Sequence, residues 1–198
     1  MRRLVLFMHM SLDGYVEAPE DQSISSPGED HGIMETVVVD LTSDADTLLL
    51  GRLTADPLLD YWLNAEAKDP NLSEGEIAYA RWATGARKAV FSHTEETLPW
   101  SDAELLLVKG DEDMVQAVST LKQQPGKNII VHGGVRTAQA LARLNLIDEY
   151  QLVVPPVALG DGQPLFSKLP GRLELRLAQV LELKAGGLFL RYQPAERT

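Results

Sequence analysis

Four short segments of this sequence carry residue types that can hold a phosphorylated ligand. Arginine forms charge-assisted hydrogen bonds to phosphate, and hydroxyl side chains add neutral ones. Glycine lets the backbone turn tightly and approach a ligand without a Cβ in the way. The segments are Asp13-Gly14, Gly51-Arg52-Leu53-Thr54, Ser92-His93-Thr94 and Gly133-Gly134. If the fold brings them together, they form an anion-binding site.

The glycine pair lies where the sequence changes from strand-like to helix-like. Residues 128–131 are a short, apolar, β-branched run of the kind that forms a buried parallel strand. Apolar residues then recur at helical spacing over 135–144, and the N-terminus of such a helix carries unpaired N–H groups and a partial positive charge. The first turn of this helix holds Val135, Arg136 and Thr137. The pair suits a phosphate; a plain tight turn is the alternative, and no third glycine completes a Rossmann fingerprint.

The other three segments also follow predicted strands. Apolar and β-branched runs predict strands over 4–8, 47–50, 87–92, 104–108 and 148–154, and helical spacing predicts helices over 33–41, 58–63, 77–84 and 112–122. Ser73 and Glu76 have the spacing of a capping box before the third of these helices. Open α/β sheets bind ligands at the carboxyl ends of their strands. Four such strand ends together therefore indicate a site more strongly than any one of them.

The order of these elements predicts the fold class. βα units come first, and residues 173–183 and 189–192 form a terminal antiparallel hairpin with one buried and one solvated face. We expect one α/β domain over residues 1–198, with a mainly parallel sheet that carries an antiparallel edge. Residues 18–32 are polar and rich in proline, glycine and serine, so we expect a flexible loop there, either a lid or a disordered segment.

The composition excludes several classes of function. The sequence contains no cysteine, so thiolate metal sites and cysteine nucleophiles are ruled out, and the four histidines lack the spacing of a metal site. The net charge of −11 opposes nucleic-acid binding. No segment reaches the roughly 20 apolar residues of a membrane span, and the N-terminal apolar run is too short for a secretory signal. We therefore expect a cytoplasmic protein.

Taken together, the motifs of this chain resemble those of dihydrofolate reductase-like reductases. The resemblance is to the branch that contains the C-terminal reductase domain of bifunctional riboflavin-biosynthesis deaminase/reductases and its stand-alone relatives. It implies a three-layer dihydrofolate reductase-like domain. The motifs follow the family's order and extend over nearly the whole chain: Ser11-Leu12-Asp13-Gly14, Leu50-Gly51-Arg52-Leu53-Thr54, Val90-Phe91-Ser92, His132-Gly133-Gly134, Leu146-Ile147-Asp148-Glu149 and the run from Pro156 to Gly162.

The resemblance implies NADPH as the cofactor and assigns contacts at each strand end. The helix that begins after Gly51 would face the phosphates, Ser92 and its neighbours the adenosine side, and the glycine pair the pyrophosphate. An arginine near the 2′-phosphate is the charge-assisted pairing that a preference for NADPH needs. The implied cofactor-binding residues are Gly14, Arg52, Leu53, Thr54, Ser92, His93, Gly133, Gly134, Val135, Arg136 and Thr137.

The resemblance also implies where the chemistry takes place, and it leaves the proton donor open. Asp13 and Gly14 would lie under the nicotinamide and the substrate, with a plain turn as the alternative. Dihydrofolate reductases carry a proton-donating carboxylate on the helix before the Gly-Arg motif. The family's usual separation from Gly51 points to Glu35, and Asp40 is the other candidate on that helix. Partial burial would raise the pKa of such a carboxyl, as donation at neutral pH requires.

Two positions depart from the family pattern. The helix motif continues Thr54-Ala55-Asp56-Pro57 where the family usually has Thr-Tyr-Glu, and Asp56-Pro57 by itself suits a cap and first turn just before residue 58. His132 precedes the glycines, where apolar or small residues are also common. It is either a pocket residue or a hydrogen-bonded histidine at a strand end.

These implications predict an NADPH-dependent reductase that passes a hydride to a C=N or C=O bond of a small pterin- or ribosylaminopyrimidine-like substrate. Members of this branch pair through their C-terminal strands, so a homodimer is expected. The competing hypothesis is a nucleotide-binding sensor or partner-binding protein of the same fold without turnover. A third is an unrelated α/β fold that binds no nucleotide.

Overall fold

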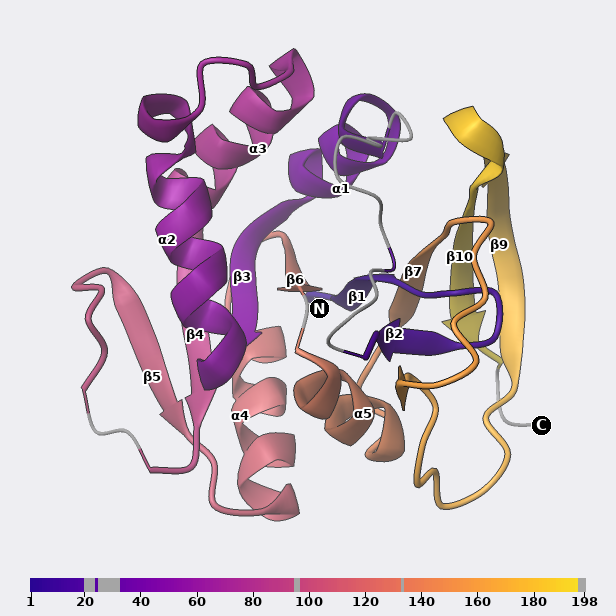
Figure 1. Cartoon of the computed structure of the whole chain (residues 1–198). Coiled ribbons are helices and arrows are strands. Elements are labelled where there is room, and N and C mark those ends of the chain that lie inside the picture. Colours follow the sequence, from indigo (N-terminus) through magenta and orange to yellow (C-terminus); the bar gives the residue numbers. More distant parts are fainter. Residues whose placement is uncertain (20–23, 25–32, 95–96, 133, 196–198) are drawn as a thin grey trace.

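The centre of the molecule is one eight-stranded sheet (Figure 1). The structure is a computed structural model that describes residues 1–19, 24, 33–94, 97–132 and 134–195. The strands are β1 (Leu4–His9), β3 (Ala45–Gly51), β4 (Arg87–Ser92), β5 (Ala103–Leu107), β6 (Asn128–His132), β7 (Glu149–Val154), β9 (Leu175–Glu182) and β10 (Leu188–Pro194). Their order is β5-β4-β3-β6-β1-β7-β10-β9, and β10 is antiparallel to both of its neighbours while the other pairs are parallel. The predicted sheet is confirmed.

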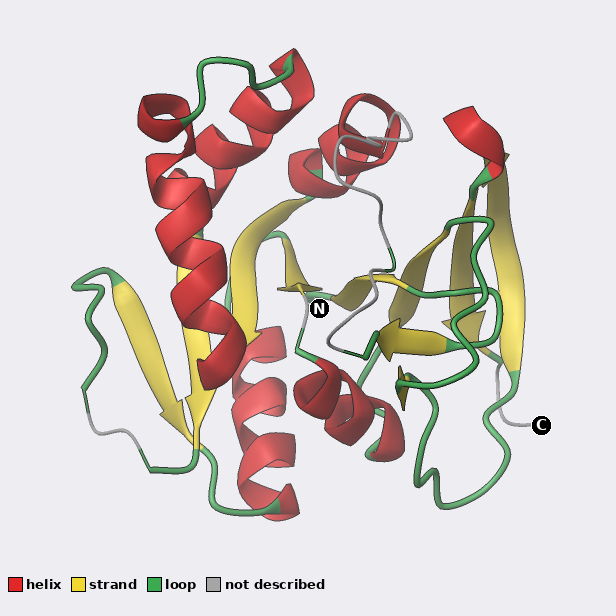
Figure 2. Ribbon diagram, in the orientation of Figure 1, coloured by secondary structure: helices red, strands yellow, loops and turns green. Residues whose placement is uncertain are grey.

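Helices cover both faces of the sheet and complete three layers (Figure 2). Their bounds are Val39–Ser43 for α1, Arg52–Lys68 for α2, Glu74–Gly85 for α3, Asp111–Gln123 for α4 and Val135–Arg143 for α5, and a π-helical turn, Met34–Val38, precedes α1. One apolar cluster lies between the sheet and α1, α2 and α3, and the other lies between the sheet and α4 and α5. No helix in the described part of the chain is long and apolar enough to cross a membrane.

The side chains of β1 alternate between the two faces of the sheet and therefore pack into two different apolar clusters. Val5 and Phe7 belong to the apolar cluster beneath α1, α2 and α3, whereas Leu4 and Leu6 belong to the cluster on the other face. Both faces are buried, which explains the continuous apolar run in the sequence. The same alternation turns His9 to the side of Phe7, and the two ring centroids lie 6.1 Å apart in an edge-on contact.

The helix after β3 begins earlier than its local cap signal predicts. Asp56-Pro57 predicts a start near residue 58, but α2 begins at Arg52, directly after Gly51, as the family motif implies. Pro57 therefore lies inside the helix, where it removes one backbone hydrogen bond near the N-terminus. The capping box of α3 forms as predicted, because the Ser73 hydroxyl accepts from the Glu76 N–H and the Glu76 carboxylate accepts from the Ser73 N–H.

The sequence patterns did not predict two short strands. β2 (Tyr15–Glu17) and β8 (Gln163–Pro164) form a separate antiparallel pair, and each is too short for an alternating pattern to show. Gly162 has a φ of +136°, and an added Cβ there would overlap the Glu17 carbonyl. The loop predicted over 18–32 lies outside the described residues except at positions 18, 19 and 24.

β9 forms an edge of the sheet and is exposed along its length. The hairpin of β9 and β10 has the predicted antiparallel pairing, with a register shift between Arg191 and Tyr192. No residue of β9 is buried, so the predicted division into one buried and one solvated face is wrong for this strand. The reason is its position at the end of the strand order, where no described element covers it. Its exposed apolar residues are Leu177, Val180 and Leu181.

Candidate active site

A cleft of about 1000 Å³ lies at the carboxyl ends of the central strands. The ends of β1, β3, β4 and β6 and the starts of α2, α4 and α5 contribute to its walls, which is where open α/β sheets bind ligands. The structure therefore brings together three of the four segments that the sequence singles out. Nine of the predicted cofactor-binding residues line the cleft: Arg52, Leu53, Thr54, Ser92, His93, Gly134, Val135, Arg136 and Thr137.

The starts of α2 and α5 pack against each other through two glycine–threonine contacts. A Cβ on Gly51 would overlap the Thr137 hydroxyl, and a Cβ on Gly134 would lie 2.8 Å from the Thr54 hydroxyl. Gly134 also has a φ of +77°, in the left-handed region that favours glycine. Because both backbones approach closely, the unpaired N–H groups of two helix starts meet at one cleft. Their partial positive charges add there, which favours a bound anion.

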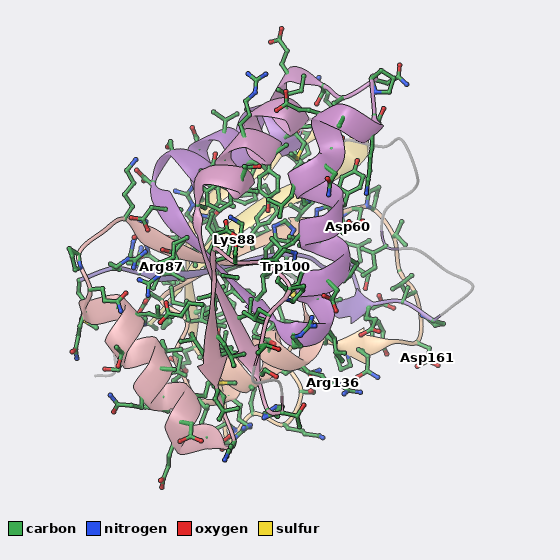
Figure 3. All side chains as sticks on the ribbon, turned by 90° about the vertical axis from the view of Figure 1, so that its left-hand side faces the viewer. Asp60, Arg87, Lys88, Trp100, Arg136 and Asp161 are labelled. Carbon is green, nitrogen blue, oxygen red and sulfur yellow. The ribbon has the colours of Figure 1, made fainter. Side chains whose placement is uncertain are left out.

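Arg52 places a guanidinium beside this pair of helix starts. Its guanidinium carbon lies 5.5 Å from the centre of the Trp100 ring, and Figure 3 shows Trp100 next to α2. Its Nη1 lies 2.6 Å from Oδ2 of Asp56, close enough for an ion pair but without hydrogen-bond geometry. Nε and Nη1 are buried and find no hydrogen-bond partner among the described residues. Since buried polar groups are normally paired, these donors indicate a ligand.

The cleft is locally more basic than the chain as a whole. Arg136 lies exposed at the start of α5 and forms no ion pair within the described residues. The other arginine of the lining, Arg143, is held by both carboxylate oxygens of Asp111 at 2.6 Å. Arg136 therefore remains available to an anion despite the net charge of −11, whereas Arg52 would share its charge between an anion and Asp56.

The end of β4 contributes polar groups to the same cleft. Ser92 is buried, and its hydroxyl accepts a hydrogen bond from the Thr94 N–H at 3.3 Å. The exposed His93 turns its Nδ1 to the Val108 carbonyl, which ties the end of β4 to the chain after β5. This strand end can offer hydroxyl and imidazole groups to the polar part of a nucleotide, and its contact with the adenosine side stays a prediction.

The β1 and β6 side of the cleft carries aromatic and imidazole rings. Phe7 and His132 are paired across the two strands, with ring centroids 5.5 Å apart. Nδ1 of His132 lies 2.7 Å from the hydroxyl of Tyr79 on α3. Burial lowers the pKa of His132 to about 4, with a further lowering from His9, and burial raises the pKa of Tyr79 well above its usual range. Both groups are therefore neutral near pH 7.

His132 is thus both of the things that the sequence left open, a hydrogen-bonded strand-end histidine and a pocket residue. His9 also lines the cleft but was missed, although its alternation with Val5 and Phe7 was a usable signal. Tyr79 lies on a helix far away in the sequence, and no local pattern could have placed it here.

Asp13 and Gly14 lie outside the residues that line the cleft. The Asp13 carboxylate accepts hydrogen bonds from the Ser11 hydroxyl at 2.7 Å and from the backbone N–H groups of Leu159 and Gly160. The hydrogen bonds from Ser11 and from this loop lower the pKa of Asp13 to about 2. An ionised carboxylate cannot donate a proton, so this geometry gives no support to the predicted catalytic role of Asp13.

Asp13 and Gly14 instead hold the loop that precedes β8. Gly14 has a φ of +90° and donates its N–H to the Ser11 carbonyl, while its own carbonyl accepts from the Leu165 N–H. Together the two residues join the turn before β2 to the segments on either side of β8. Val16, Glu17 and Gln163 of this region line the cleft, so the turn positions a wall of the site.

The remaining predicted residues are only partly placed. Glu35 lies in the π-helical turn Met34–Val38, and its side chain is outside the described part of the structure. Gly133 also lies outside the described residues. Asp40 is exposed in the first turn of α1. Their catalytic and cofactor-binding roles stay predictions.

The layers, the strand order and the position of the cleft define a dihydrofolate reductase-like fold. The chain belongs to the RibD C-terminal domain family, whose model matches residues 2–189, and the predicted resemblance is therefore confirmed. Among curated proteins it is similar to the uncharacterized protein YyaP of Bacillus subtilis (strain 168), with 28% identity over 188 residues that cover 93% of this chain and 91% of that protein. Family and fold are both reductase-like.

Solved structures share the fold at low sequence identity. A Shewanella sp. PV-4 protein named for riboflavin biosynthesis superposes with a TM-score of 0.71 at 23% identity, covering 98% of this chain and 99% of that one. The diaminohydroxyphosphoribosylaminopyrimidine deaminase/5-amino-6-(5-phosphoribosylamino)uracil reductase of Thermotoga maritima gives 0.62 at 16%, with 98% of this chain and 57% of that one covered. Dihydrofolate reductase of Enterococcus faecalis, complexed with NADP(H), gives 0.57 at 10%, with 98% and 97% covered.

The contact between the helix starts predicts the effect of a single methyl group. Gly51→Ala is expected to lower the free energy of unfolding by about 1–3 kcal/mol, because the new Cβ overlaps the Thr137 hydroxyl. Adding Thr137→Ala is expected to restore most of this loss in a double-mutant cycle measured by denaturant unfolding. Gly85→Ala is the matched control, since no atom lies within 4 Å of its added Cβ. A Gly51→Ala variant as stable as that control contradicts the contact.

The hydrogen bonds to Asp13 predict a pH-dependent stability. The folded-state pKa of about 2 lies below the ordinary value, so ionised Asp13 stabilises the fold above about pH 4 and loses this effect as the pH falls toward 2. Asp13→Asn is therefore expected to lower the melting temperature most near neutral pH, with the difference from wild type narrowing in acid. Asp60→Asn, on the exposed surface of α2, is the control. A difference that stays constant down to about pH 2 contradicts the assignment.

Proposed function

We propose that this protein is an NADPH-dependent reductase that passes a hydride to a C=N or C=O bond of a small pterin- or ribosylaminopyrimidine-like substrate. The observation that carries the proposal is the pair of helix starts facing one cleft beside Arg52, whose buried Nε and Nη1 have no hydrogen-bond partner among the described residues. Backbone N–H groups at a helix start and a guanidinium are the ligands that a phosphate needs. Membership of a reductase-like family supports the redox assignment.

The residues of the cleft suit the parts of a phosphorylated dinucleotide. The starts of α2 and α5 would hold the pyrophosphate, and the end of β4 the adenosine side, with Arg52 or Arg136 available to the 2′-phosphate. When bound, NADPH supplies the hydride, and the protein supplies binding and orientation. The volume of about 1000 Å³ is at the upper end for ligand pockets, which suits a dinucleotide together with a small substrate.

The rings on the β1 and β6 side of the cleft suit a planar substrate. Phe7 contacts both His9 and His132 edge-on, and the three rings offer apolar surface with nitrogen atoms at its border. Flat heteroaromatic rings pack well against such groups. The uracil reductase named for the Thermotoga maritima neighbour, although similar at the level of fold alone, supports a pyrimidine-type substrate.

A nucleotide-binding sensor of the same fold is the second candidate. It is favoured by the acids of the described cleft lining, which are Glu17 and Asp111, both exposed. Neither side chain has the buried surroundings that a general-acid carboxyl needs at neutral pH. Both candidates predict NADPH binding, so a binding measurement cannot distinguish them. A measurement of turnover can, because only the reductase oxidises NADPH.

The exposed edge of the sheet supports a homodimer. Long, exposed edge strands invite pairing with another chain, and β9 adds exposed apolar residues that include Leu177 and Val180. A second copy of this chain is the partner that the strand fits, because it would bring the same apolar residues to the contact.

The phosphate contacts predict cofactor binding that depends on Arg52. NADPH is expected to raise the melting temperature, by the equivalent of about 2.7 kcal/mol at a hundredfold excess over the dissociation constant. Calorimetry is expected to show about tenfold weaker binding of NADH, which lacks the 2′-phosphate, and a loss of about tenfold or more in Arg52→Gln. Arg172→Gln, in an exposed loop before β9, is the matched control. The absence of any shift with NADPH contradicts the proposal.

The same samples test turnover. NADPH absorbance, followed with pterin, pyrimidine and quinone-type substrates, is expected to fall with at least one of them. NADPH binding without oxidation by any member of this panel would favour the sensor.

The edge strand predicts the oligomeric state. Light scattering is expected to give twice the chain mass for the wild type, and Val180→Glu is expected to give the monomer, because a carboxylate would be buried at the contact. Val115→Glu, an exposed valine on α4, is the control and should leave the mass unchanged. A monomeric wild type excludes the dimer.

A further inference from the structure

The hydrogen bond between Tyr79 and His132 has only one arrangement that leaves no buried proton unpaired. Both groups are neutral, so either the Tyr79 hydroxyl donates to Nδ1 or an Nδ1 proton points to the hydroxyl oxygen. Tyr79 is 2% exposed, and its hydroxyl has no other partner among the described residues. In the second arrangement the phenolic proton would be buried without an acceptor, which costs about 1–3 kcal/mol. Tyr79 is therefore the donor.

This direction fixes the tautomer of His132. With Nδ1 accepting from Tyr79, the ring proton of the neutral imidazole must be on Nε2. Among the described residues, the hydrogen bond of the His132 ring is the one at Nδ1, and the half-buried ring lines the cleft. The groups packed around the ring are Phe7 and His9 of β1 and Tyr79 of α3. The cleft wall thus presents a neutral, oriented N–H donor.

The alternation of β6 explains why a histidine can reach this position. Ile130 belongs to the apolar cluster beneath α1, α2 and α3, and His132 follows two residues later on the same face. It is the last residue of the strand, so one edge of its ring meets α3 while the ring also borders the cleft. The ring is held by packing and by Tyr79, as a positioned donor requires.

Resting on the proposed function, we propose that His132, held in its Nε2–H form by Tyr79, donates the proton that accompanies hydride transfer. His132 would be the catalytic residue, and Tyr79 a positioning residue that acts through it. Asp13 is ionised and outside the cleft lining, so it cannot fill this role. A neutral imidazole is chemically suited to it, because it can polarise a carbonyl or imine without carrying a charge.

The proposed step balances with solvent water as the final proton source. Hydride adds to the carbon of the C=O or C=N bond, and the π electrons of that bond move onto the oxygen or nitrogen. This atom, now strongly basic, takes the Nε2 proton of His132. The imidazolate left behind regains its Nε2 proton from water that reaches the open cleft, and the hydroxide formed takes up a proton from the solvent. The net change is reduction of one double bond, oxidation of one NADPH and consumption of one proton.

Nitrogen NMR of the imidazole tests the tautomer without any substrate. In the wild-type protein, His132 is expected to show a protonated Nε2 and an unprotonated Nδ1, unchanged between about pH 5 and about pH 8. Tyr79→Phe is expected to move both nitrogen signals toward a mixture of tautomers. Tyr61→Phe, the same change at a neighbouring tyrosine outside the cleft lining, is expected to move neither. A protonated Nδ1, or titration near the ordinary histidine pKa, overturns the proposal.

Kinetics on the best substrate of the panel test the proton transfer. His132→Leu is expected to lower kcat about a hundredfold or more with little change in NADPH affinity, and Tyr79→Phe is expected to lower kcat less. His132→Gln keeps an N–H donor and is expected to recover part of the loss. Glu35→Gln is the competing variant. If it abolishes turnover while His132→Leu keeps wild-type kcat, the proton donor is the carboxylate and the proposal is wrong.

Failure of the proposed function can be distinguished from failure of the proton-donor proposal. A wild type that oxidises NADPH with no member of the panel refutes turnover for every variant alike. The proton transfer is then refuted with it, whereas the tautomer set by Tyr79 is still decided by the NMR signals of the free protein.

Discussion

The close approach of two helix starts is the constraint on which the rest of the site depends. Gly51 meets Thr137 and Gly134 meets Thr54, so neither glycine has room for a Cβ. The result is two sets of unpaired N–H groups open to one cleft, where their partial positive charges repel each other. An anion between them relieves that repulsion, and the buried donors of Arg52 add to its attraction. This arrangement is the basis of the phosphate site that we propose within an acidic protein.

The two sides of the cleft have different electrostatic character because different groups line them. The helix-start side has backbone N–H groups and arginines, while the β1 and β6 side has the neutral rings of Phe7 and His132. Burial keeps His132 uncharged, and the hydrogen bond from Tyr79 sets its tautomer. A charged, phosphorylated part of a ligand and a planar, reactive part therefore meet surfaces of matching chemistry. This division supports a dinucleotide with a small heteroaromatic substrate beside it.

Local signals in the sequence predicted the parts of the site that are built from local structure. Gly51-Arg52 and Gly134 lie at strand-to-helix turns, and both helix starts line the cleft. Tyr79 was beyond reach, because its contact with His132 joins residues 53 positions apart through tertiary packing. The role of Asp13 stays a prediction without structural support, because a turn that binds a distant loop and a turn that faces a ligand have the same sequence. The exposure of β9 likewise depends on its place at the sheet edge, which a hydrophobic pattern does not reveal.

A structure determined with NADPH bound tests the central claim most directly. The account predicts the pyrophosphate between the starts of α2 and α5, with the guanidinium of Arg52 on a phosphate and the nicotinamide on the side of His132. Nicotinamide at the end of β4, or a nucleotide bound away from the two helix starts, would contradict it.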